Sequence, residues 1–126
     1  MILRTAPATV FLAVTEVEPA LTFYRDALGL EFVTDDPFAL VFRGPGYELR
    51  LSKVPEFTPL PFTILDWQVD DIRASIKALA AKGVERAVFK GIEVDGDGVW
   101  TSPDGGAQIF WFKDPDANVL SISQRS

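Results

Sequence analysis

The sequence predicts an α+β fold that contains two copies of one module, each built as strand, helix, strand, strand and strand. Three observations lead to this prediction: an internal repeat, two amphipathic segments that each end at a glycine, and three short strand candidates after each of them. The chain has 126 residues and is 48% apolar, which is enough for one compact core and too little for two. We therefore expect a single domain over residues 1–126, with modules 6–53 and 62–124 joined by a linker at 54–61.

The repeat relates AVTEVEPALTFYRDALGL, which starts at Ala13, to QVDDIRASIKALAAKGV, which starts at Gln68. In both segments a β-branched strand ends at an acidic residue, an amphipathic helix follows, and a glycine ends the helix. Val14 matches Val69 at an offset of 69 − 14 = 55, and the two glycines match at 83 − 29 = 54. The two halves therefore align to within one residue.

Each predicted helix has its own start, apolar stripe and stop. In the first, Pro19 occupies an early position where proline is tolerated, and Thr15 with Glu18 fits a capping box. In the second, Asp70 or Asp71 is placed to cap the first turn. The stripes are Ala20, Leu21, Tyr24 and Leu28 before Gly29, and Ile72, Ile76 and Leu79 before Gly83.

Strand candidates lie between turn signals rich in Gly, Pro and Asp. They are Leu30–Thr34, Phe38–Arg43 and Tyr47–Lys53 in the first module, and Ala87–Val94, Ala107–Lys113 and Val119–Ser123 in the second. Between the modules, the segment VPEFTPLPF contains three prolines, which favour an extended linker.

Two acidic segments of the second module are expected to be turns. The segment 95–98 (DGDG) is similar to the start of a calcium loop, but later loop positions lack the oxygen ligands, so we expect a hairpin turn. The segment 114–118 (DPDAN) is also expected to be a structural turn. A positive φ is expected there at Asn118 or Asp116 rather than at Ala117.

Composition excludes several classes of function. The net charge is −6 and the 12 basic residues are scattered, which argues against nucleic acid as a partner. The apolar run Val10–Val14 is too short for a signal peptide or a membrane span, so we expect a soluble, cytoplasmic protein. The chain has no cysteine and no histidine, which excludes disulfides, thiol nucleophiles, Ser-His-Asp systems and imidazole metal ligands. Any chemistry must use carboxylates, hydroxyls, Lys, Arg or Tyr.

Two strings, FYRDALGLEFV after the first strand and WFKDPDANVLSI near the end, give the chain a resemblance to a known family. On them the chain is identified as a member of the vicinal oxygen chelate superfamily, which includes glyoxalase I, extradiol dioxygenases, fosfomycin-resistance enzymes and bleomycin-binding resistance proteins. The resemblance spans residues 6–124. It implies two βαβββ units that form a curved mixed sheet around a cavity.

The resemblance also implies where a metal would be held. Metal-dependent members carry ligands on the first strand of each module and a Glu on the last strand, and these positions fall at Thr9, Ile64 and Ser121 here. None is a good ligand for a divalent metal, so we predict a protein with no metal and no cofactor. A rearranged carboxylate site for Mg or Mn at Glu48 and Asp66 is the alternative.

Strand alternation defines one face for ligand and one for the core. Arg50 is predicted on the same face as Glu48 and Asp66, and would more simply neutralise one of them as an ion pair. Phe38, Phe42 and Ile64 add apolar surface to the ligand face, and the opposite phase should pack under the helices. The candidate ligand-binding residues are Thr9, Phe11, Arg50, Asp66, Gln68, Trp100, Trp111 and Ser121.

Three functions follow. The first is a metal-free homodimer that binds a small, partly aromatic molecule, as the resemblance to bleomycin-resistance proteins implies. The second is a metal-independent lyase or isomerase, in which Glu48 or Asp66 is the general base and Arg50 stabilises an enolate. The third is an interaction module with no ligand, in which side chains fill the cavity.

Overall fold

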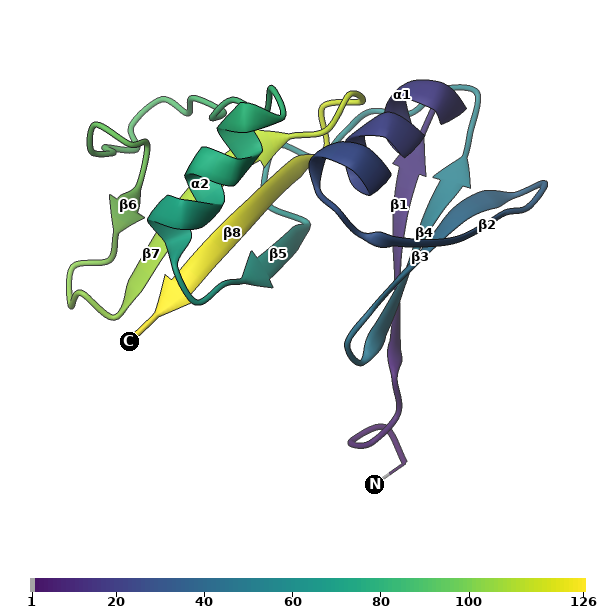
Figure 1. Cartoon of the computed structure of the whole chain (residues 1–126), viewed down its shortest axis with the longest axis horizontal. Helices are drawn as coiled ribbons and strands as arrows, with labels where there is room; N and C mark the ends of the chain where they lie inside the picture. Colours follow the sequence, from purple (N-terminus) through teal and green to yellow (C-terminus); the bar gives the residue numbers. More distant parts are fainter. Residues whose placement is uncertain (1) are drawn as a thin grey trace. The chain divides into compact units, whose positions relative to one another are not determined.

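The computed structural model describes residues 2–126, which divide between Thr58 and Pro59 into two compact units (Figure 1). The boundary between the units falls inside the proline-rich linker. Each unit contains a helical segment and one four-stranded mixed sheet. The two-module α+β fold predicted from the repeat is therefore confirmed.

The same strand order occurs in both units because the module is repeated. The first unit contains β1 (Ala8–Val14), α1 (Val17–Leu21), η1 (Thr22–Ala27), β2 (Glu31–Asp35), β3 (Ala39–Gly44) and β4 (Tyr47–Lys53), with sheet order β1-β4-β3-β2. The second contains β5 (Leu65–Gln68), α2 (Ile72–Ala81), β6 (Trp100–Thr101), β7 (Ala107–Lys113) and β8 (Val119–Arg125), with sheet order β5-β8-β7-β6. In each unit the first strand runs parallel to the last, and the other pairs are antiparallel.

The first helical segment begins differently from the prediction. Glu16, not Thr15, is at the N-cap of α1, and the side chain of Glu16 makes no capping hydrogen bond. The segment widens into a π-helical turn, η1, within which Tyr24 is fully buried. Gly29 follows with φ +73°, as expected of a glycine that ends a helix.

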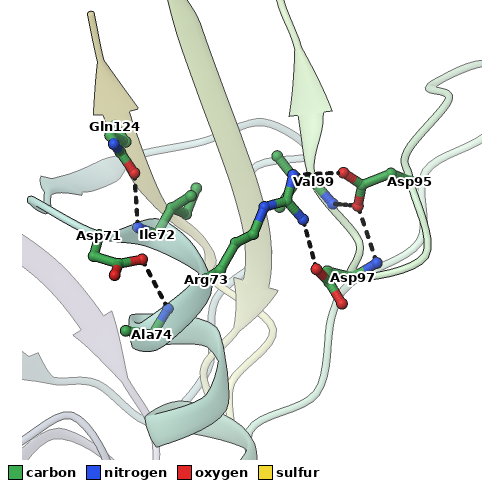
Figure 2. Close-up of polar contacts among 8 residues, drawn as sticks. All are labelled: Asp71, Ile72, Arg73, Ala74, Asp95, Asp97, Val99 and Gln124. Carbon is green, nitrogen blue, oxygen red and sulfur yellow. Dashed lines mark hydrogen bonds and ion pairs between the residues drawn. The ribbon is translucent and has the colours of Figure 1, made fainter.

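The second helix, α2, is held at its N-terminus by two side chains (Figure 2). Asp71 accepts a hydrogen bond from the backbone N–H of Ala74 at 3.1 Å, which confirms one of the two predicted caps. Gln124 on β8 accepts from the N–H of Ile72 at 2.8 Å, so the helix is also fixed to the sheet. Within residues 2–126, no helix is long and apolar enough to cross a membrane.

The core lies between each helix and its sheet. Of the residues predicted to pack there, Leu12, Val14, Leu120 and Ile122 are buried, while Val10, Leu65, Trp67 and Val69 are half-buried.

Phe42 was expected on the ligand face, and this is wrong. Its ring is fully buried 5.9 Å from the ring of Tyr24, because Phe42 shares the phase of Leu49 and not that of Arg50.

The strand predicted at Ala87–Val94 is absent. Gly91 has φ +84°, outside the β region, and interrupts the alternating pattern that suggested a strand. The N–H of Ala87 still donates to the carbonyl of Trp111 at 2.8 Å, but the edge strand of this sheet is the short β6. Every other predicted strand lies within two residues of its predicted bounds.

The turn at 114–118 also differs from the prediction. Ala117 has φ +68°, the only positive φ of a non-glycine residue within residues 2–126. Asp114 explains this, because its Oδ1 accepts from the N–H groups of Asp116 and Asn118 at 2.9 Å each, and its Oδ2 from Asn118 Nδ2 at 2.8 Å. Those bonds fix the residues on either side, so the left-handed conformation falls on Ala117.

Candidate functional site

The second unit contains a hollow of about 220 Å³ on the face of its sheet that α2 leaves open. The hollow is lined by three aromatic side chains and four smaller residues, and we call it the Trp111 hollow. Its lining residues are Pro61, Phe62, Thr63, Phe89, Ile92, Trp111 and Val119. No lining residue carries a titratable side chain, so its surface suits an apolar or aromatic group.

Trp111 is held in place from three sides. Its indole Nε1 donates to Thr63 Oγ1 at 2.8 Å, which satisfies the polar edge of the ring. The ring of Phe89 meets it edge to face, with centroids 6.1 Å apart, and the ring of Trp100 lies 6.2 Å away. These contacts fix the indole beside the hollow without filling the space.

Asp66 lies on the same open face, two strands from Trp111. It pairs with Ser121 across β5 and β8, and Ser121 pairs with Trp111 across β8 and β7. Ser121 Oγ donates to Asp66 Oδ1 at 2.6 Å, and Ser123 Oγ donates to Oδ2 at 2.7 Å. Both serines are buried, at 2% and 1% exposure, whereas Asp66 is exposed. The strand alternation predicted for these residues is therefore correct.

The candidate residues of the first unit form a different arrangement. Arg50 Nη2 lies 3.0 Å from Asp36 Oδ2, so the prediction that Arg50 pairs with Glu48 or Asp66 is wrong. Asp36 is positioned by its Oδ1, which accepts from the N–H groups of Phe38 and Ala39 at 2.8 and 2.7 Å. These two bonds, together with Arg50, hold the pKa of Asp36 below its ordinary value.

The remaining candidates are exposed or half-buried. Thr9 and Phe11 are exposed on β1 and pair with Glu48 and Arg50 of β4, respectively. In the second unit Gln68 is exposed on β5 beside Ser123. Phe38 is 77% exposed just before β3.

Sequence reasoning missed most of the hollow's wall. Phe62 and Thr63 were assigned to the start of a module, and Phe89 and Ile92 to a strand that does not exist. Gly91, which breaks the alternation between Phe89 and Ile92, was the one sequence signal for an irregular wall.

The wall that carries Phe89 and Ile92 is anchored to α2 by an arginine (Figure 2). Arg73 donates to Asp95 Oδ2 at 2.8 Å and to Asp97 Oδ2 at 2.5 Å. Asp95 also accepts from the N–H groups of Asp97 and Val99, which closes the predicted turn at 95–98. Arg73 first, and then the N–H of Val99, lower the pKa of Asp95.

The residues present do not fit a divalent metal ion. Ile64 has no donor atom, and the hydroxyl of Ser121 is buried and donates to Asp66. Across residues 2–126, no three Asp or Glu side chains gather in a group that would hold an ion. A single carboxylate whose two oxygens already accept hydrogen bonds is a poor chelator.

The fold points to a class of protein. The chain matches the model of the Glyoxalase/Bleomycin resistance protein/Dioxygenase superfamily over residues 6–122. It belongs to that superfamily. No curated protein matches the chain.

Solved structures share the fold at low sequence identity. A glyoxalase family protein from Enterococcus faecalis is 18% identical, with 98% of this chain and 99% of that chain covered and a TM-score of 0.74. TnmS3, an antibiotic binding protein from Streptomyces sp. CB03234, is 23% identical, with 100% and 99% covered and a TM-score of 0.73. Lactoylglutathione lyase from Agrobacterium tumefaciens is 20% identical, with 95% and 93% covered and a TM-score of 0.64.

Proposed function

We propose that this protein binds a small molecule through an aromatic ring that occupies the Trp111 hollow, and that it does so without a metal ion. The observation that carries the proposal is the lining of the hollow: three aromatic side chains, a hydroxyl already bonded to Trp111, and no acid or base. An aromatic face of this kind binds planar groups by stacking and by apolar burial. The description of the related fold TnmS3 as an antibiotic binding protein supports a binding role.

The size of the hollow sets the size of the group that enters it. Whole ligands of drug size occupy pockets of roughly 300–1,000 Å³. A dry apolar cavity of about 150 Å³ is enough for benzene. At about 220 Å³ the hollow takes one ring, and the rest of the ligand lies along the open face of the sheet.

The same lining favours binding over catalysis. A lyase or isomerase needs a base within hydrogen-bond reach of the reacting atom and a cation for the enolate. The hollow is lined by no acid or base, and Arg50, the predicted cation, is engaged with Asp36. An open hollow also argues against an interaction module whose cavity is filled by side chains.

We also propose that the protein is a homodimer. Phe11 is 64% exposed on β1, and burial of such a ring contributes about 1.5–3 kcal/mol. Sedimentation equilibrium of the wild type and of Phe11→Ser tests this. A wild-type dimer that Phe11→Ser weakens is expected, and a wild-type monomer at high concentration would contradict it.

A thermal-shift screen with aromatic antibiotics, aromatic acids and thiol conjugates tests the binding function. A hit is expected to raise the Tm of the wild type and to have a much smaller effect on Trp111→Ala, which removes the ring that borders the hollow. Val88→Ala, which removes an exposed apolar side chain of the same unit outside the lining, is the control and should keep most of the shift. Hits that shift Trp111→Ala as much as the wild type would refute the assignment of the hollow.

A further inference from the structure

We propose that the carboxylate of Asp66 binds a cationic nitrogen of the ligand whose ring occupies the Trp111 hollow. This inference rests on the proposed function and adds the chemical class of the ligand: an arylalkyl amine or an aryl amidine that is positively charged at neutral pH. It comes from how Asp66 is held, from the charges around it, and from its position relative to Trp111.

Asp66 is oriented by hydrogen bonds from two serine hydroxyls. Ser121 and Ser123 are almost fully buried, and each donates to a different oxygen of the carboxylate. A carboxylate has about four acceptor positions, so roughly two remain on its exposed side. Because rotation of the carboxylate would break one of the two bonds, the remaining positions point in a fixed direction, which lowers the cost of binding a donor there.

The charge of Asp66 is not neutralised by its own unit. Within residues 59–126 it forms no ion pair, and its neighbour Gln68 is neutral. Arg125 lies on the same face of β8, two residues beyond Ser123, and makes no ion pair with Asp66. A fixed, partly free carboxylate attracts an ammonium or amidinium group and repels an anion.

The position of Asp66 fits a second contact for a ligand in the hollow. Asp66, Ser121 and Trp111 lie in one row across three neighbouring strands. Two strand spacings place the backbones of Asp66 and Trp111 about 10 Å apart, a distance that a ring with a short alkyl arm spans. Lys113 lies over the ring of Phe89, 5.8 Å from its centroid, so a cation already lies beside this wall residue of the hollow. The ligand's cation therefore points toward Asp66 and away from Lys113.

Three compounds that share one phenyl ring and one arm test the inference: 4-phenylbutylamine, 4-phenylbutan-1-ol and 4-phenylbutyrate. Their dissociation constants are measured by two-dimensional NMR titration of the full chain at pH 7. The wild type is expected to bind the amine about tenfold more tightly than the alcohol, as for a hydrogen bond to a charged group, and the carboxylate more weakly still. In Asp66→Asn the amine is expected to fall to the affinity of the alcohol, with the alcohol itself unchanged.

Two controls separate this inference from the proposed function. Glu85→Gln removes one exposed negative charge of the same unit, at a position beside α2 and outside the lining of the hollow, and should preserve the preference for the amine. Trp111→Ala should weaken all three compounds together. Equal affinity of wild type for amine and alcohol, or an amine preference that survives in folded Asp66→Asn, would overturn the inference and leave the hollow intact. Failure of all three compounds to bind would overturn the proposed function and the inference with it.

Discussion

Asp66 and Ser121 lie opposite each other on the parallel strands β5 and β8, and the hydroxyl of Ser121 donates to Asp66 Oδ1 at 2.6 Å. Ser121 occupies the position where the resemblance to metal-dependent members places a Glu ligand. Here that position supplies a hydrogen-bond donor that orients a neighbouring carboxylate. Ser121 therefore helps to fix the negative charge of Asp66 in place. Several measurable consequences follow from this and from other contacts in the protein.

Metal ions are expected to leave stability unchanged. A divalent ion present at 100 times its Kd would add about 2.7 kcal/mol to the free energy of unfolding, which corresponds to a shift of several degrees. Because Thr9, Ile64 and Ser121 do not form a chelating set, we expect equal Tm values with EDTA and with Mg, Mn or Zn ions at millimolar concentration. A saturable increase of Tm with one of these ions would show that a site exists.

The bond between Trp111 and Thr63 is expected to stabilise the second unit. In a double-mutant cycle with Trp111→Phe and Thr63→Val, measured by urea unfolding, the coupling energy should be about 0.5–1.5 kcal/mol. The bond from Nε1 to Oγ1 at 2.8 Å is the source of that coupling. Additive effects of the two substitutions would mean that water replaces the bond at no cost.

Ala117→Gly is expected to stabilise the protein. Ala117 has φ +68°, and an alanine in this region costs roughly 1–2 kcal/mol relative to a residue without a Cβ. Glycine loses about 0.5–1 kcal/mol of that gain through the entropy of the unfolded chain, so a net increase of about 0.5–1 kcal/mol is expected. Ala74→Gly, inside α2 at a helical position, is the control and should destabilise.

Asp114→Ala is expected to be among the more damaging single changes. Asp114 is 5% exposed and accepts hydrogen bonds from the N–H of Asp116 and from the N–H and Nδ2 of the buried Asn118. Their loss leaves buried donors unsatisfied, at a cost of about 2–4 kcal/mol in the free energy of unfolding. Asp104→Ala, in an exposed turn, is the comparison and should cost clearly less. Similar losses for the two variants would show that burial does not set the penalty.

The stability that Asp95 contributes is expected to disappear in acid. Hydrogen bonds from Arg73 and from the N–H of Val99 lower its pKa in the folded state below the ordinary value of 3.8. A lowered folded-state pKa means that the contribution is present above about pH 4 and is lost as the pH falls through the folded value. The difference in Tm between wild type and Asp95→Asn should therefore be largest near pH 7 and shrink below pH 4.

The exposed carboxylate of Glu93, in the same wall segment, provides the control for this titration. Glu93→Gln should give nearly the same Tm as wild type both at pH 7 and at pH 3. A difference for Asp95→Asn that stays constant down to pH 3 would mean that the Arg73 contact does not depend on ionisation.

Much of the fold was predictable because its determinants are local. The repeat, the apolar stripe of α2 and the cap by Asp71 depend on residues close together in the chain, and strand alternation placed Asp66, Ser121 and Ser123 on one face. The sequence also excluded imidazole and thiolate chemistry, because those side chains are absent from it.

Tertiary structure decided the partners and the space between elements. Which carboxylate Arg50 contacts depends on where the turn before β3 presents Asp36. The wall of the Trp111 hollow depends on how residues 85–99 run beside β7 without forming a strand. Alternation along a strand is a property of neighbouring residues, whereas a pairing or a hollow is set by groups that meet only after the chain has folded. A hydrogen bond or ion pair between side chains distant in sequence depends on their distance and direction in the folded protein. The sequence alone gives neither quantity.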